Sequence, residues 1–323
     1  SGIIQFWQTE MVLYWSQYVF IATNIVSFPL YLLIIVVCVK EYKYNPAQRA
    51  FNLLVISQGV MDILLMASYF FFGTLRLSEL VNGFFWTYKD YSIAMWCFNQ
   101  TYISAILRCF GVLVISFQRY ISLCKSVNPT MQLINTSYRW ILPMAQWIVP
   151  TLYSVPILIF SNATFKAPDN LEVMIEHKDI TVATSTTAIF VTITFFLCSF
   201  CYVNILRFLV KNRYSVSVAV KRERRLYMQM MGLFVGFVLL FVFYVLQFRF
   251  SLNSDNDPIF TMRTIFPVIS CFFSYVNIWM MLVLNEDIRR KLLALIRRGP
   301  AEKISTHMST SMKAISTVNV VRF

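Results

Sequence analysis

Seven long apolar stretches, separated by short polar segments, set the pattern of this chain. A helix rises about 1.5 Å per residue, so about 20 apolar residues cross the hydrocarbon core of a membrane. Continuous runs of this length favour helices over a membrane β-barrel, whose strands are short and alternate in polarity. We place the seven helices near residues 17–39, 50–72, 97–124, 140–160, 182–210, 226–248 and 262–284. The sequence therefore predicts an all-α membrane protein, a seven-transmembrane helix bundle spanning residues 17–284.

A further short helix is predicted directly after the seventh run, over residues 285–299. Asn285 is a typical N-cap, and Gly299 followed by Pro300 marks the end of the helix. The apolar residues repeat at helical spacing and share one face, namely Ile288, Leu292, Leu295 and Ile296. This pattern predicts an amphipathic helix lying on the inner membrane surface. The remaining segments are residues 1–16, expected outside the cell, and residues 300–323, a Ser/Thr-rich tail expected to be disordered.

Composition supports lipid as the solvent for most of the chain. Hydrophobic residues make up 58% of the sequence, and the mean hydropathy is +0.62. Charged residues make up only 13%, against about a quarter in soluble domains. The chain is too apolar for a soluble protein.

The net charge of +13 is distributed in a way that predicts orientation. With the N-terminus outside, the inner loops, span ends and tail carry about +16 and the outer segments about −3, which follows the retention of basic residues in the cytosol. Six basic residues remain outside, namely Arg76, Lys89, Lys166, Lys178, Arg249 and Arg263. The charge is therefore a topology signal and not a nucleic-acid footprint.

Three glycosylation sequons bear on the same orientation. Asn162 lies in the outer loop after the fourth run, where we expect a glycan, whereas Asn135 lies inside and should stay unmodified. Asn99 lies too close to the membrane for its sequon to decide the matter. Asn162 is therefore the predicted glycosylation site.

Cysteine and histidine usage gives no sign of a metal or cofactor site. The cysteines lie in or at the ends of the apolar runs, namely Cys38, Cys97, Cys109, Cys124, Cys198, Cys201 and Cys271. Both histidines, His177 and His307, fall outside the runs, and the chain lacks a Gly-rich phosphate loop and a GxSxG motif. We expect no cofactor, no metal and no enzymatic activity.

Two ionisable residues deep in the predicted bundle are candidates for function. Asp62 lies in the second run and Arg108 in the third, and such residues are costly in lipid and therefore face the bundle interior. We expect them to form an ion pair, which serves either as a polar knot that fixes helix packing or as a switch. Arg119 lies eleven residues after Arg108, almost three helical turns, so both lie on one face with Thr101, Ser104, Val112 and Ile115.

Short motifs around these residues resemble rhodopsin-like G-protein-coupled receptors. The matching positions are Asp62 in the second span, Gln118, Arg119 and Tyr120 at the end of the third, Trp147 in the fourth, and Asn277 and Asn285 at the end of the seventh. Departures are Gln118 for an acid, Ile278 for a proline, Met281 for a tyrosine, and an outer loop without the usual cysteine. With these departures, and in the segment "SFQRYISLCKSVNP", the chain resembles more closely the nematode chemoreceptors called serpentine receptors, of class V or class gamma.

The resemblance implies a receptor at the plasma membrane of a sensory cilium, with a heterotrimeric G protein as its cytoplasmic partner. Gln118, Arg119 and Tyr120 would face that partner, and Asp62, Arg108 and Asn277 would form an intramembrane polar network. An arrestin-like protein is a further possible partner at the tail, if its Ser/Thr residues are phosphorylated. Arg119 could instead be an interfacial arginine that reaches the lipid headgroups.

An extracellular small molecule is the expected ligand. We expect its cavity between the outer ends of the third, fifth, sixth and seventh spans, because aromatic and apolar walls with few polar groups suit a small organic molecule. The candidate lining residues are Thr101, Ser104, Tyr244, Gln247, Phe248 and Arg263, with Arg249 also at the rim. The two rim arginines indicate an anion or only balance Asp255 and Asp257.

A transporter or a ligand-gated ion channel is the alternative function. Either would predict a continuous polar path or repeats with matched broken helices, and the sequence has no such repeat. An intramembrane hydrolase lacks its nucleophile motif here, and the basic-residue bias disfavours the opposite orientation of insect-type odorant channels.

Overall fold

The computed structural model describes residues 14–44, 49–78, 81–124, 140–168, 171–211, 218–253 and 256–297. Its elements are α1 (Trp15–Tyr44), α2 (Arg49–Tyr69), the π-helix η3 (Phe70–Leu75), α3 (Asn82–Thr87), the 3₁₀-helix η4 (Lys89–Tyr91), α4 (Ile93–Cys124), α6 (Ile141–Phe160), β1 (Ala163–Phe165), β2 (Val173–Ile175), α7 (His177–Lys211), α8 (Val218–Leu252), α9 (Asn256–Leu284) and α10 (Glu286–Arg297). Asn135 and the segments 1–13 and 298–323 lie outside the described residues.

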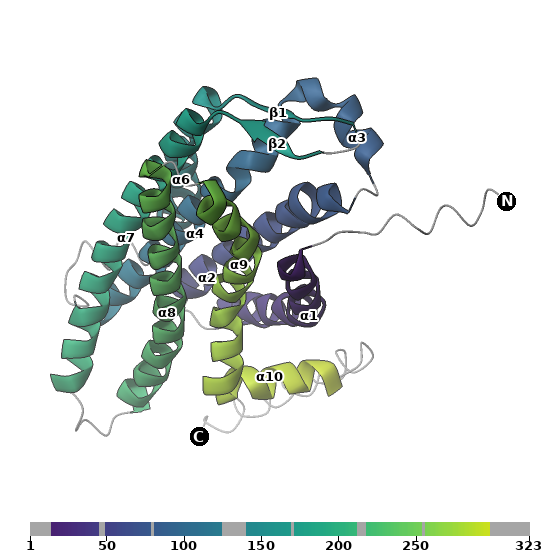
Figure 1. Cartoon of the computed structure of the whole chain (residues 1–323). Coiled ribbons are helices and arrows are strands. Elements are labelled where there is room, and N and C mark those ends of the chain that lie inside the picture. Colours follow the sequence, from purple (N-terminus) through teal and green to yellow (C-terminus); the bar gives the residue numbers. More distant parts are fainter. Residues whose placement is uncertain are drawn as a thin grey trace, which may run out of the picture.

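Seven of these helices are long and apolar enough to cross a membrane, which confirms the predicted bundle. They are α1, α2, α4, α6, α7, α8 and α9. Of these, α7, α8 and α9 stand side by side in Figure 1, and α1 packs against α9. Most of the helices extend beyond the predicted windows. For example, the first spanning helix covers Trp15–Lys43 and the fifth His177–Lys211, because polar and aromatic residues at both ends continue the helical backbone.

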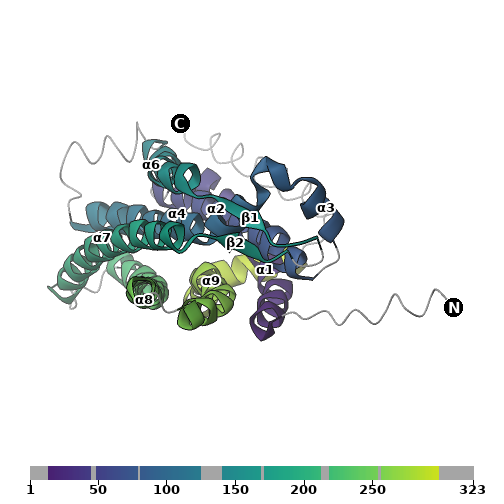
Figure 2. The same ribbon diagram turned by 45° about the horizontal axis from the view of Figure 1, so that its top comes forward.

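The third spanning helix, α4, is the centre of the bundle. Within its most apolar window 78% of the residues are buried, against 22% for the first spanning helix. It contacts α2, α6, α7 and α8, and it runs between them in Figure 2. The predicted shared face of this helix is buried from Ser104 to Arg119. A polar stripe on this helix therefore faces protein and not lipid, as expected from the cost of charge in hydrocarbon.

The end of the bundle that carries the β-hairpin is capped by a small aromatic layer. β1 and β2 form an antiparallel hairpin in which Thr164 pairs with Met174. Phe85 of α3 is fully buried against Phe165 of the hairpin and against the start of α4. Burial of the Phe85 ring fixes α3 against the hairpin, since a buried aromatic side chain removes a large apolar area from water.

The short helix after the seventh span is present as α10 and lies across the end of α9 (Figure 1). The backbone N–H of Ile288 donates to the Asn285 side chain over 3.3 Å, which is the predicted N-cap. Leu292 is buried, while Ile296 of the predicted apolar face is 61% exposed. Lys291 Nζ lies 2.6 Å from Glu41 Oε1 of α1. The helix is therefore tied to the first spanning helix.

Gly111 permits a close approach of three helices. The Gln146 amide of α6 donates to Gln58 Oε1 of α2 over 2.7 Å, directly beside Gly111 on α4. A Cβ at Gly111 would lie 1.8 Å from Gln58 Oε1 and 2.9 Å from Gln146 Nε2. Only glycine leaves room for this amide pair.

We expect Gly111→Ala to destabilise the bundle. The new methyl group displaces both amides, and unsatisfied buried polar groups cost about 1 to 3 kcal/mol each. The melting temperature of the purified protein in detergent should fall, and removal of the Gln58 side chain in the same molecule should recover part of the loss. Gly83→Ala, where an added Cβ meets no atom within 4 Å, is the control. Equal melting temperatures for the two variants would contradict this expectation.

Candidate functional site

The two buried charges predicted to pair do so in the middle of the bundle. Arg108 Nε of α4 lies 3.2 Å from Asp62 Oδ1 of α2, and both side chains are almost fully buried. Tyr31 donates its hydroxyl to Asp62 over 2.8 Å, and Gln58 Nε2 donates over 3.3 Å. The carboxylate is therefore surrounded by donors, as a buried charge requires.

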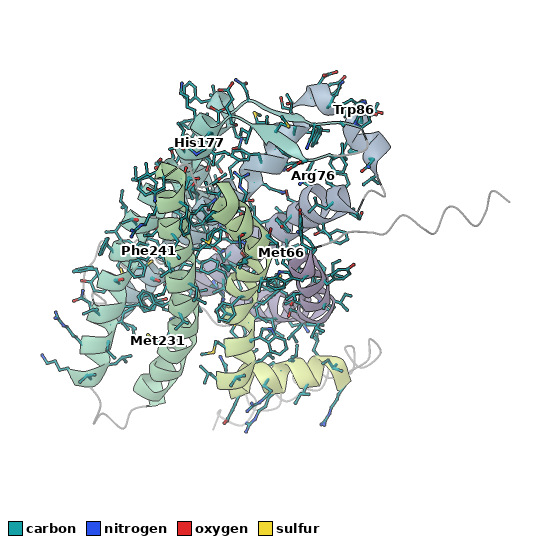
Figure 3. The ribbon with its side chains drawn as sticks, viewed as in Figure 1. Met66, Arg76, Trp86, His177, Met231 and Phe241 are labelled. Atoms are coloured by element: carbon teal, nitrogen blue, oxygen red, sulfur yellow. The ribbon has the colours of Figure 1, made fainter. Side chains whose placement is uncertain are left out.

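The guanidinium of Arg108 also contacts two groups beyond the carboxylate. Nη1 donates to Ser270 Oγ of α9 over 2.5 Å, and Nη2 lies 3.3 Å from the Met66 sulfur. Figure 3 shows Met66 near the middle of the bundle, far from either end. Polar contacts from this one pair therefore reach α9 as well as α2.

The network around Asp62 joins helices that are distant in sequence. Through Tyr31, Gln58, Arg108, Gln146 and Ser270 it links α1, α2, α4, α6 and α9. A rearrangement of the pair would change the packing of all five helices together, because each depends on a hydrogen bond to the same cluster.

Asn277, predicted to belong to this network, lies on α9 seven residues after Ser270. Seven residues are about two helical turns, so it shares the face of Ser270 nearer to α10. The neighbouring Tyr275 donates its hydroxyl to Asn24 of α1 over 2.5 Å. Its ring packs edge-on against Tyr31 at 5.9 Å between centroids. Tyr275 lies two residues before Asn277, about 200° around the helix, so these contacts with α1 do not bring Asn277 to α1.

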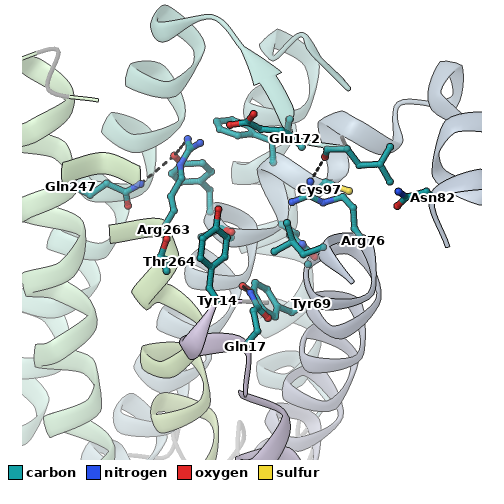
Figure 4. Close-up of a pocket in the computed structure, with 18 residues that line it drawn as sticks. Tyr14, Gln17, Tyr69, Arg76, Asn82, Cys97, Glu172, Gln247, Arg263 and Thr264 are labelled. Atoms are coloured by element: carbon teal, nitrogen blue, oxygen red, sulfur yellow. Dashed lines mark hydrogen bonds between the residues drawn. The ribbon is translucent and has the colours of Figure 1, made fainter. Parts of the chain in front are cut away.

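A cavity of about 510 Å³ opens at the end of the bundle that holds the start of α1 and the hairpin (Figure 4). This volume falls within the range of roughly 300 to 1,000 Å³ typical of small-molecule sites. The lining combines apolar and polar groups from α1, α2, η3, α3, α4, α8, α9 and the β-hairpin region. A small organic molecule with polar substituents fits such a cavity.

Tyr102 organises the polar side of this cavity. Its hydroxyl accepts from Gln247 Nε2 of α8 at 3.4 Å and from Arg263 Nη2 of α9 at 3.3 Å. The same hydroxyl lies 3.2 Å from Thr184 Oγ1 of α7. The guanidinium of Arg263 also lies over the Phe98 ring, with Cζ 4.9 Å from the ring centroid. One hydroxyl thus brings together α4, α7, α8 and α9.

Arg76 lines the side of the cavity opposite Arg263, and its hydrogen bonds are structural. Its Nε donates to the Phe72 carbonyl over 3.1 Å, and its Nη1 donates to the Leu171 carbonyl of the loop before β2. Burial lowers the pKa of the Arg76 guanidinium from its usual value. Figure 3 places this residue beneath the hairpin. Arg76 therefore fastens the loop before β2 to the end of η3.

The predicted ligand residues divide into two groups. Thr101, Gln247 and Arg263 line the cavity. Ser104, Tyr244 and Phe248 are not among its described lining residues: Ser104 donates to the Thr101 carbonyl, and Tyr244 donates to the same carbonyl over 3.0 Å. Arg249 is exposed. Asp255 and the Asp257 side chain lie outside the described residues.

The predicted set of lining helices needs correction. Among the described residues the fifth span, α7, supplies none of the lining, whereas the first two spans supply Gln17 and Tyr69. The start of α1 meets the end of α2, where the Gln17 amide donates to the Tyr69 hydroxyl over 3.1 Å. The Tyr69 ring also packs against Phe266 of α9, with 6.1 Å between centroids. Arg76 also lines the cavity, and its sequence signal is that of an isolated cation at the edge of an apolar run.

Gln118, Arg119 and Tyr120 lie at the opposite end of the same helix, α4. Arg119 is only 4% exposed, and its guanidinium carbon lies 3.3 Å from the centroid of the Phe51 ring on α2. Gln118 is buried, and Tyr120 packs against Phe200 of α7 at 6.0 Å between centroids. Arg119 is therefore held by protein, which disfavours an arginine extended to lipid headgroups.

The two sequons within the described residues have different environments. Asn162 is exposed between α6 and β1, and its backbone N–H donates to Asp179 over 3.1 Å. Asn99 is fully buried in α4, where its amide donates to Ser161. A buried amide cannot accept a glycan, so Asn99 is excluded. All seven cysteines are free.

Comparison with protein families agrees with this architecture. The sequence model of the family described as serpentine type 7TM GPCR chemoreceptor Srv matches residues 20–298. A comparison with curated proteins finds no match. The family match covers all seven spanning helices apart from the first turn of α1, and it selects class V over class gamma. The chain belongs to the Srv family of serpentine seven-transmembrane chemoreceptors, which are G-protein-coupled receptors of nematodes.

Proposed function

We propose that this protein binds an extracellular small molecule in the cavity above Tyr102 and activates a heterotrimeric G protein through the opposite end of the bundle. Its N-terminus lies outside the cell, and the receptor sits in the plasma membrane, in a sensory cilium by analogy with other serpentine receptors. No bond of the ligand is made or broken.

One observation carries this proposal: a single helix, α4, joins the three functional regions. It contributes Thr101 and Tyr102 to the cavity, Arg108 to the buried ion pair and Arg119 to the opposite end. A ligand that binds one packing of these helices better than another shifts the equilibrium between them. A switch needs contacts that have two discrete arrangements, and we propose that the ion pair and its partners are these contacts.

The environment of Arg119 supports a role for Phe51 in holding this arginine in place in the inactive receptor. Gln118 stands where a carboxylate would form a charge-assisted bond, which is about twice as strong as a neutral one. A cation over an aromatic ring contributes about 0.5 to 2 kcal/mol, so stacking on Phe51 compensates for part of the missing charge. We infer that Arg119 leaves this ring when the receptor becomes active.

A second-messenger assay over a panel of volatile and pheromone-like compounds tests the proposal. Cells that express the receptor with a reporter for each G-protein class should respond to at least one compound, and untransfected cells should not. Ion currents that persist when G-protein signalling is blocked would favour the channel alternative and contradict the receptor mechanism.

A further inference from the structure

Arg263, at the polar side of the cavity, forms no ion pair with a carboxylate among the described residues. Within the described part of the chain its contacts are the Tyr102 hydroxyl and the Phe98 ring. A neutral hydroxyl uses one of the five N–H donors of a guanidinium and none of its charge. Arg263 lines the cavity, so donors of its guanidinium remain for a ligand there.

The charge of the cavity is positive on balance. Its described lining contains Arg76, Arg263 and one carboxylate, Glu172. That carboxylate is already paired, because Lys166 Nζ lies 3.3 Å from Glu172 Oε2. Arg76 is committed to two backbone carbonyls, which leaves Arg263 as the group able to bind a ligand anion.

Gln247 supplies a second, independent observation. Its side chain is 1% exposed and lines the cavity, and its Oε1 has no hydrogen-bond partner among the described residues. A buried acceptor without a donor costs about 1 to 3 kcal/mol. Figure 4 shows Gln247 and Arg263 reaching toward the same point from α8 and α9. A ligand donor at this point would satisfy the acceptor beside the cation.

We propose that the ligand of this receptor is a small organic anion, such as a carboxylate, that also carries a hydroxyl or N–H donor. The anion binds Arg263, the donor binds Gln247 Oε1, and the apolar body lies along Phe98 and Val173. This inference rests on the proposed receptor function and names the chemical class of its ligand. The paired groups sit on α8 and α9, so an occupied site holds these two helices together at their outer ends.

The test measures direct binding of small acids to the purified receptor in detergent. Binding is detected as a rise in the melting temperature of the receptor, and the affinity is obtained by titrating each compound. The probes are straight-chain carboxylates from hexanoate to dodecanoate, their 3-hydroxy forms, and the methyl ester of each. At least one acid should bind and its ester should bind at least about tenfold more weakly, since hydrogen bonds to charged groups are worth about that factor or more. The 3-hydroxy acid should bind more tightly than the plain acid.

Variants assign the effect to the two residues. Arg263→Gln should abolish the preference for acid over ester, and Arg263→Lys should keep part of it because the charge remains. Gln247→Leu should remove only the advantage of the 3-hydroxyl group. Arg249→Gln, which removes an exposed arginine at the same end of α8, is the matched control and should bind like the original receptor.

Three outcomes would overturn the inference: no acid in the series binds, esters bind as tightly as acids, or Arg263→Gln leaves the acid preference intact. Binding is measured without a G protein, so the result is separate from signalling. A receptor that binds acids but activates no G protein would contradict the proposed function and leave the ligand class standing.

Discussion

Replacing Arg108 with alanine is expected to remove most of the receptor from the cell surface. The change leaves the Asp62 carboxylate buried without its cation, and breaking a buried ion pair in this way costs about 3 to 5 kcal/mol. Tyr31 and Gln58 still donate to the carboxylate, but neither neutralises it. The loss of folded receptor is measured as surface expression with an extracellular epitope tag. The loss of stability is measured as the melting temperature of the purified protein.

A double-mutant cycle identifies the pair as the cause. Asp62→Ala should also be damaging, and the variant with both changes should be less damaged than the sum of the two single losses. Lys166→Ala is the control, since it breaks an ion pair of similar length whose side chains are both about half exposed. Exposed pairs contribute only about 0 to 1 kcal/mol. Losses that add strictly would contradict coupling between Arg108 and Asp62.

Arg119→Ala is expected to remove most of the G-protein activation and to leave ligand binding intact. Arg119 lies at the far end of α4 from the cavity, so its loss removes a cation from the proposed G-protein surface and no group from the cavity lining. We expect the maximal second-messenger response to fall at least about tenfold, the factor associated with losing a hydrogen bond to a charged group. Binding of the activating compound and surface expression should remain near the original values.

Arg207→Ala provides the matched control, because Arg207 is exposed on α7 at the same end of the bundle. Its response should stay close to that of the original receptor. Two further variants test how Arg119 is held in the inactive receptor. Gln118→Glu should lower basal signalling, because it adds a carboxylate beside the arginine. Phe51→Leu should raise basal signalling, because it removes the aromatic ring. A full response from Arg119→Ala would contradict a role for this arginine in coupling.

The sequence predicted the helices well because the membrane imposes a simple rule on them. Long apolar runs cross the hydrocarbon, and charges inside them must face protein. For this reason the pairing of Asp62 with Arg108 could be expected from the cost of charge in lipid, and the buried face of α4 from helical spacing. The cap at Asn285 could be expected from the residue type at the start of the helix.

The cavity was predicted less well, since its lining depends on how the helices lean. Periodicity shows which face of a helix is buried, but not which neighbour covers that face. Tyr244 shares the polar region with Tyr102, yet its hydroxyl turns to the Thr101 carbonyl. Gln17 and Tyr69 line the cavity because the start of α1 meets the end of α2. The Phe51 ring beneath Arg119 could not be expected either, because no sequence spacing relates them.

The orientation of the bundle decides whether the cavity faces the outside and Arg119 the cytosol. A topology measurement on intact cells tests this directly, with epitope tags at the two ends of the chain and glycosylation read at Asn162 and Asn135. We expect the N-terminal tag to be accessible to antibody without permeabilisation, the C-terminal tag to need it, and glycan to be present on Asn162 alone. A C-terminal tag accessible on intact cells, or glycan on Asn135, would contradict the proposed arrangement.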